Sequence, residues 1–218
     1  MLDAMAIDGF WKNVAPAWRA VDGPLEAEIL ETASNALSEI APQLTLEGAK
    51  IPGGSEVIFG ARGVLRHFKL AREMAAKAPA MPGIKIRALR DPRPLPDCVS
   101  KDGVELPLAT TRFHAVPVLS RYGVLLLTRE VKINDYVAFR NLAKTVVMDL
   151  IGEERYGLFV TDVQVMDHAD WETGAGGVES LPLADLARII PHPAGHTAAA
   201  PVVEVVQDNN RRDGTRAV

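Results

Sequence analysis

The stretch NDYVAFRNLAKTVVMDLIG, residues 134–152, carries the clearest folding signal in this chain of 218 residues. Its apolar side chains recur at spacings of three and four residues, which is typical of a helix with one buried face. These side chains are Tyr136, Phe139, Leu142, Ala143, Val146, Val147 and Leu150. Asn134 suits the N-cap and Gly152 suits the C-terminal end. The pattern therefore predicts a helix over 135–151 that packs on the rest of the protein.

Strands are predicted on both sides of this helix. Residues 109–118 and 122–129 form a predicted hairpin with Ser120-Arg121 at its turn, and 156–166 is a further strand. The apolar run 124–127 is typical of a central strand that is covered on both faces. Pro117 indicates that its own strand lies at an edge or carries a bulge.

The N-terminal half also mixes helices with strands. Apolar spacing predicts helices over 24–41, with Pro24 in the first turn, and over 63–78. Trp11 and Trp18 lie in a stretch where we expect a further helix, broken near Pro16. Alternation and turn residues predict strands at 44–47, 56–60 and 84–88.

This order of elements favours an α+β fold, with about six strands in a mainly antiparallel or mixed sheet and helices packed on it. Residues 90–107 hold four prolines and are expected to form a loop. We predict a single α+β domain over 1–190. Residues 191–218 are rich in Pro, Ala, Asn and Arg, and are expected to form a loosely ordered tail with a potential edge strand at 202–206.

Composition restricts the class of protein. Hydrophobic residues make up 48% and charged residues 24%, values that are typical of a globular domain. No apolar run is long enough for a transmembrane helix, and the first residues lack the basic start of a secretory signal. The single cysteine, Cys98, excludes an internal disulfide and a cysteine-based zinc site. We expect a cytoplasmic protein without a membrane partner.

The net charge of −4 conceals two opposed blocks. Residues 62–93 contain nine basic residues and two acidic ones, a local +7, whereas residues 145–187 contain nine acidic residues and one basic one, a local −8. The basic block predicts a binding patch made of Arg62, Arg66, Lys69, Lys85 and Arg87. Such a patch could receive nucleic acid, an anionic ligand or an acidic protein. The acidic block could instead neutralise it, within the fold or across a homodimer.

Three segments resemble, in order and spacing, a family of uncharacterised bacterial α+β proteins. They are IAPQLTLEGA at 40–49, the loop Ala78-Pro79-x-x-Pro82-Gly83 before a strand, and MDLIGEERYGLFVTDVQV at 148–165 with its Gly-Glu at the end of a helix. The similarity covers roughly residues 10–187. It implies an α+β fold in a bacterial protein. No activity is established for the family, so the resemblance implies no catalytic residues.

Sequence patterns for cofactors and catalysis are absent. The glycine pairs lack the residues of a phosphate-binding loop or a dinucleotide fold, and no nucleophile elbow occurs. His192 and His196 have a metal-ligand spacing, but prolines flank the first of them. Glu153 and Glu154 are interpreted as exposed charge at a helix end. We therefore predict no metal, no cofactor and no catalytic residue.

The leading hypothesis is a non-catalytic protein-binding or regulatory module whose partner is another protein or a second copy. One alternative is an enzyme with a dispersed site, built from acids within 153–170 and a histidine such as His114 or His168. The other is weak nucleic-acid binding through the block 62–93, although a sequence pI of about 5.8 argues against nucleic acid.

Overall fold

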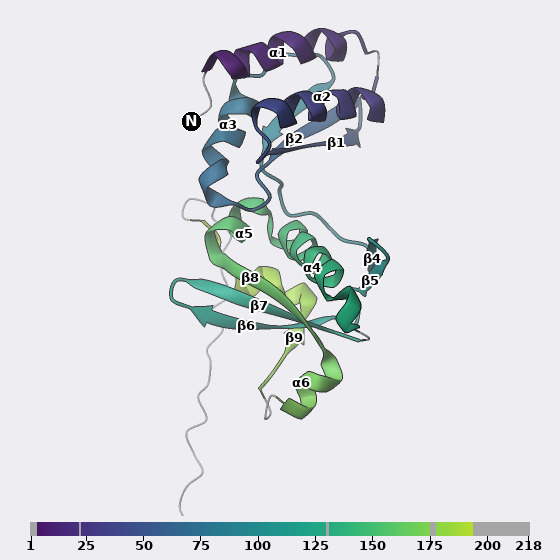
Figure 1. The fold of residues 1–218 in the computed structure, drawn as a ribbon, viewed down its shortest axis with the longest axis vertical. Coiled ribbons are helices and arrows are strands. Elements are labelled where there is room, and N and C mark those ends of the chain that lie inside the picture. Colours follow the sequence, from purple (N-terminus) through teal and green to yellow (C-terminus); the bar gives the residue numbers. More distant parts are fainter. Residues whose placement is uncertain (1–3, 22, 130, 175–177, 194–218) are drawn as a thin grey trace, which may run out of the picture.

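The computed structural model describes residues 4–21, 23–129, 131–174 and 178–193. Within these ranges the chain forms seven α-helices and three sheets of three, two and four strands (Figure 1). The predicted α+β class is thus confirmed. The strands are divided among three sheets, whereas the sequence predicted one sheet of about six strands.

The N-terminal lobe, residues 4–89, is a three-stranded sheet with all its helices on one face. Its elements are α1 (Ala4–Arg19), α2 (Ala27–Ile40), β1 (Thr45–Ile51), β2 (Gly54–Gly60), η1 (Leu65–His67), α3 (Phe68–Ala76) and β3 (Ile84–Ala88). Strand β2 is antiparallel to β1 and parallel to β3. The rings of Phe10 and Trp11 pack edge-on against Phe59 of β2, which fixes α1 over the sheet.

The C-terminal lobe, residues 98–193, is built around a four-stranded sheet. Its first elements are β4 (Cys98–Lys101), β5 (Val104–Pro107), β6 (Arg112–Val118), β7 (Arg121–Thr128), η2 (Ile133–Asp135) and α4 (Tyr136–Ile151). They are followed by α5 (Glu153–Phe159), β8 (Val160–Asp167), α6 (His168–Gly174), β9 (Leu181–Pro182), η3 (Leu183–Asp185) and α7 (Leu186–Ile189). The strand order is β8-β7-β6-β9, with β8 parallel to β7.

Both lobes contain the same connection between strands. An antiparallel hairpin, β1–β2 or β6–β7, is followed by a helical crossover and a strand parallel to the second strand of the hairpin. Each lobe has its own hydrophobic core, one drawn from residues 7–89 and the other from residues 104–190. The two cores are separate, so polar groups carry much of the contact between the lobes.

The predicted helix over 135–151 is confirmed, and the elements beside it differ in detail. Asp135 rather than Asn134 occupies the N-cap position of α4, without a side-chain capping hydrogen bond, and the Gly152 N–H closes the last turn on the Met148 carbonyl. The predicted strand 156–166 begins only at Val160. The preceding residues form α5, because Gly152 adopts φ +83 and restarts the chain as a helix.

Four other sequence expectations need correction. Helix α1 continues through Pro16, whose ring lies on the exposed side. Helix α2 begins after Pro24, because the Leu25 N–H donates to the Ser55 hydroxyl and keeps that segment out of the helix. The second predicted helix starts with the short η1 turn. The expected loop 90–107 contains the β4–β5 hairpin.

Two expectations concern the end of the chain and membranes. The predicted tail 191–218, with its potential strand at 202–206, lies outside the described residues from 194 onward. No helix in the described ranges is long and apolar enough to cross a membrane.

Candidate functional site

The structure divides the predicted basic patch into two groups. Lys85 and Arg87 alternate along β3 with residues that pack in the core beneath the helices, so their side chains leave the opposite face of the sheet from α3. Both contact Glu56 of β2, with the Lys85 Nζ at 2.9 Å and an Arg87 Nη at 3.5 Å from its carboxylate. Arg87 also pairs with Asp91. These two cations are therefore already compensated by carboxylates.

The other group lies near the start of α3. Arg62 is an exposed loop residue with φ +53, and Arg66 is exposed within η1. Lys69 is exposed on α3 and lies 3.8 Å from the Glu73 carboxylate. The structure thus does not bring the five predicted residues onto one face, and a ligand for either group remains a prediction.

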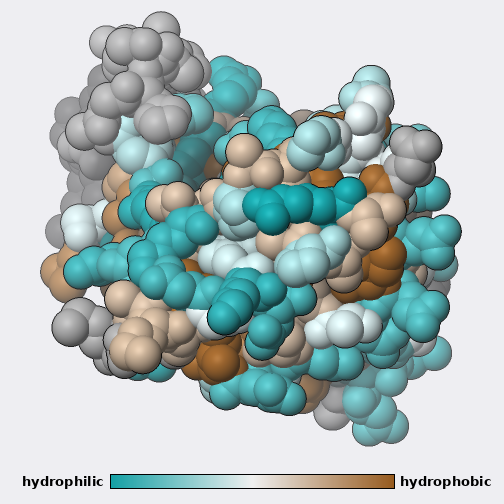
Figure 2. Space-filling model, turned by 90° about the horizontal axis from the view of Figure 1, so that it is seen from above, coloured by the Kyte–Doolittle hydropathy of each residue, from teal (hydrophilic) through white to brown (hydrophobic). Residues whose placement is uncertain are grey.

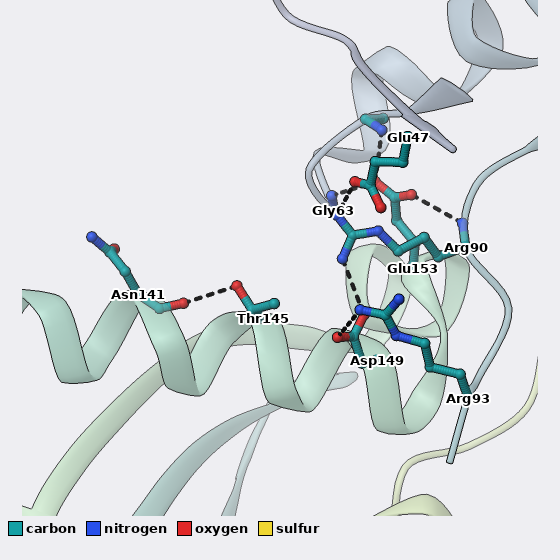
Figure 3. Close-up of polar contacts among 9 residues, drawn as sticks. Glu47, Gly63, Arg90, Arg93, Asn141, Thr145, Asp149 and Glu153 are labelled. Carbon is teal, nitrogen blue, oxygen red and sulfur yellow. Dashed lines mark hydrogen bonds and ion pairs between the residues drawn. The ribbon is translucent and has the colours of Figure 1, made fainter. Parts of the chain in front are cut away.

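The acidic block neutralises part of the basic block inside the fold. The carboxylate of Asp149 on α4 receives Arg90 at 3.0 Å and Arg93 at 2.6 Å, and Arg90 also pairs with Glu47 of β1 (Figure 3). On the surface, Arg72 of α3 lies 2.7 Å from Glu154 of α5. Each of these pairs joins the two lobes or the segment between them, so three arginines of the basic block contribute to the contact between the lobes.

Arg90 lies at the centre of this network. Its burial alone would lower the pKa of the guanidinium, but the neighbouring Glu47 and Asp149 carboxylates reverse the effect and raise the pKa. Asp149 is only 3% exposed and is compensated by two arginines. Such buried charges are tolerated only when they are paired and hydrogen-bonded.

Glu153 is the most buried charged residue of the contact between the lobes. Its side chain is fully buried at the start of α5, and its carboxylate accepts backbone N–H groups from Ala61 at 2.6 Å, Gly63 at 2.9 Å and Arg90 at 3.1 Å (Figure 3). The expectation of exposed charge at a helix end was therefore wrong for Glu153. Gly152 turns the chain so that the side chain of Glu153 enters the contact between the lobes.

Both histidines of the dispersed-site hypothesis lie near Trp171. The His114 ring on β6 stacks on Trp171 of α6 with ring centroids 5.1 Å apart, and His168 lines a pocket that also includes Trp171. Glu153, in contrast, lies in the contact between the lobes. Within the described residues, no group of three or more His, Cys, Asp or Glu side chains could hold a metal ion. His196 lies outside these residues.

Cys98 lies on the short β4 strand and is a free thiol. Its Sγ–H donates to a Glu105 carboxylate oxygen at 2.8 Å. This hydrogen bond raises the pKa of the thiol, because ionisation would place two negative charges together. A raised pKa lowers the reactivity of a cysteine.

The end of the β6–β7 hairpin exposes an apolar surface. Val116, Val118 and Leu119, named here the hairpin surface, are 46%, 43% and 103% exposed. The actual turn is Leu119-Ser120, since Val118 pairs with Arg121, and the predicted turn Ser120-Arg121 was one residue too late. The predicted strands ended at 118 and began at 122, so Leu119 was left between them without an assigned role. By comparison, the surface over α1 and α2 shows hydrophobic residues in small areas among hydrophilic ones (Figure 2).

Comparison of the chain with protein-family models, with curated proteins and with solved structures found no match. The resemblance to a family of bacterial α+β proteins therefore stays a prediction.

Proposed function

We propose that the protein is a non-catalytic binding or regulatory module that docks another protein on its hairpin surface. The observation that carries this proposal is the exposure of three apolar side chains at one end of a hairpin. Apolar surface gathered in this way commonly marks a site of protein interaction.

The conformation of Leu119 supports the proposal. It adopts φ +56 in the turn, a left-handed conformation that costs a residue with a Cβ about 1–2 kcal/mol. Asn, Asp or Gly would suit that position better. Its side chain also gains no burial in the isolated protein. Leu119 is thus unfavourable in the free protein both for its backbone conformation and for the exposure of its apolar side chain. A contact made in a complex would explain why leucine stands at this position.

The edge of β6 indicates how the partner binds. Strand β9 pairs only with Arg112 and Phe113, so the rest of β6 has no strand on its outer side within the described structure. Pro117 lies in this open part and has no N–H to donate to an added strand. We therefore expect the partner to receive the hairpin surface in an apolar pocket, by side-chain contact, rather than to extend the sheet.

Site-specific photocrosslinking tests the proposal. A photoreactive amino acid at position 119 is compared with the same group at Leu65, which is 50% exposed on the N-terminal lobe. In bacterial cells we expect a specific adduct with one other protein from position 119 and none from position 65. The partner identified in the adduct is then purified, and its binding to variants of this protein is measured. Leu119→Asp should abolish that binding, and Leu65→Asp should leave it unchanged.

Two results would overturn this function. Equal adducts from positions 119 and 65 would show that the hairpin surface has no specific partner. An adduct of two identical chains, formed by the purified protein alone, would reassign the surface to self-association.

A further inference from the structure

A second candidate site lies at one end of the C-terminal sheet, away from the hairpin surface. A pocket of about 430 Å³ opens where the parallel strands β7 and β8 have their carboxyl ends. Segments distant in the sequence line it: the residues before β6, the residue after β7, the first residue of α6 and the segment after β9. In open sheets with parallel strands, small ligands characteristically bind at this end.

The charge of the pocket has one sign. Its charged or protonatable lining residues are Arg112, Arg129 and His168, and none of its lining residues is acidic. The pocket therefore concentrates positive potential, which a bound anion would compensate.

Hydrogen bonds to Ser180 fix the orientation of the Arg112 guanidinium. Its Nε donates to the Ser180 hydroxyl at 2.8 Å, and one Nη donates to the Ser180 carbonyl oxygen. Both acceptors are neutral, so these bonds orient the guanidinium without cancelling its charge. The remaining N–H groups can make paired hydrogen bonds to an oxyanion.

Apolar side chains beside the cations indicate which chemical groups the ligand carries besides its anionic group. Leu108 and Leu183 line the same pocket. An adjoining pocket of about 470 Å³ shares Arg112 and His168 and adds the Trp171 ring, but Glu172 and Glu179 also line it. The His168 Nδ1 lies 3.5 Å from the Glu172 carboxylate. The first pocket offers the cations for an anionic head, and Leu108, Leu183 and the Trp171 ring offer contacts for an apolar or aromatic body.

We infer that this site binds a small phosphate monoester with an apolar or aromatic body. A phosphate group carries about −1.5 to −2 charges and three acceptor oxygens, which matches the guanidinium groups of Arg112 and Arg129 better than a carboxylate does. This inference does not depend on the proposed protein partner, because the two sites share no residue.

Calorimetric titration of the full chain with phenyl phosphate tests the inference. Arg129→Gln removes an exposed lining cation, and Arg66→Gln removes an exposed cation on the other lobe as a matched control. We expect saturable binding that Arg129→Gln weakens about ten- to a hundredfold, the loss of one charge-assisted hydrogen bond. Arg66→Gln should bind as the unmodified protein does. Added salt should weaken binding.

Trp171 gives a second readout, because its fluorescence should change on binding and the change should vanish in Trp171→Phe. The inference fails if phenyl phosphate shows no saturable binding, or if Arg129→Gln and Arg66→Gln bind it equally. It also fails if benzoate binds more tightly than phenyl phosphate, since the head group would then be a carboxylate. Circular dichroism of each variant checks that the fold is retained.

Discussion

Replacement of Glu153 by alanine is expected to weaken the contact between the two lobes more than any neighbouring substitution. The fully buried carboxylate is the acceptor for three backbone N–H groups, of Ala61, Gly63 and Arg90. The substitution removes all three hydrogen bonds at once and leaves the donors in place. None of these donors is a side chain that could turn toward water.

The expected loss follows from the number of donors. Each buried donor left without a partner costs about 1–3 kcal/mol, and the Gly63 and Arg90 groups are only partly buried. We therefore expect Glu153→Ala to lower the free energy of unfolding by about 3–6 kcal/mol. Since a domain is typically stable by about 5–15 kcal/mol, the loss is a large share of the total.

Urea unfolding provides the assay. In a Trp171→Phe background the remaining tryptophans, Trp11 and Trp18, both lie in the N-terminal core, so fluorescence follows that lobe and circular dichroism follows both. When Glu153 is present, the fluorescence and circular dichroism signals should give the same unfolding midpoint. In Glu153→Ala the midpoints should fall and separate, because the lobes lose their main buried contact.

The adjacent residue Glu154 supplies the control. It makes one surface ion pair with Arg72, and its side chain is 39% exposed. Glu154→Ala should therefore cost only about 0.2–1 kcal/mol. If Glu153→Ala and Glu154→Ala differed by less than about 1 kcal/mol, the reasoning from buried donors would be refuted.

Other contacts predict more local effects. Asp149→Ala should cost about 2–3 kcal/mol because it removes the charge-assisted hydrogen bonds of Arg90 and Arg93 and leaves Arg90 with Glu47 alone. Arg93→Ala, at a side chain 56% exposed, should cost less than about 1 kcal/mol. Equal losses in urea unfolding would contradict this. Gly152→Ala should cost about 2 kcal/mol or more, because Gly152 has φ +83 and a Cβ would lie 2.8 Å from a proline ring; an unchanged melting temperature would argue against it. Glu105→Gln should lower the pKa of the Cys98 thiol, since the carboxylate raises it; the pH profile of its reaction with a disulfide reagent should move to lower pH, and an unmoved profile would count against the hydrogen bond.

Periodicity alone was enough to locate the elements with strong internal patterns. The helix over 135–151 and the strand 84–88 were found because each places apolar residues on one face over several turns or alternations. The central position of the apolar run 124–127 is also confirmed, since β7 lies between β8 and β6. Short elements such as β4, β5, α5 and α6 offered too few residues for any period to appear.

The candidate sites were much less accessible to sequence reasoning. The hairpin surface was not predicted, because local sequence does not show which side chains at the end of a strand the rest of the fold leaves uncovered. The proposed phosphate site collects Arg112 of β6, Arg129 after β7 and His168 of α6, and none of them lies in a recognisable motif. The sequence predicted that Glu153 is exposed to solvent. Its hydrogen-bond donors are backbone groups about 60 to 90 residues away, which the local sequence does not show.

The residues of this chain determine its α+β class, its best helices and the existence of two opposed charge blocks, because these depend on local pattern and composition. What the two blocks do depends on the packing of the lobes. Arg90 and Arg93 meet Asp149 across about 60 residues of sequence, and Glu153 meets backbone donors about 90 residues away. Pairing at such separations follows from the packing of separate cores, which no short window of sequence contains. Of the basic block, Arg72, Arg90 and Arg93 therefore pair with carboxylates of the C-terminal lobe, whereas the predicted patch residues Lys69, Lys85 and Arg87 pair with carboxylates of their own lobe or of the segment that follows it.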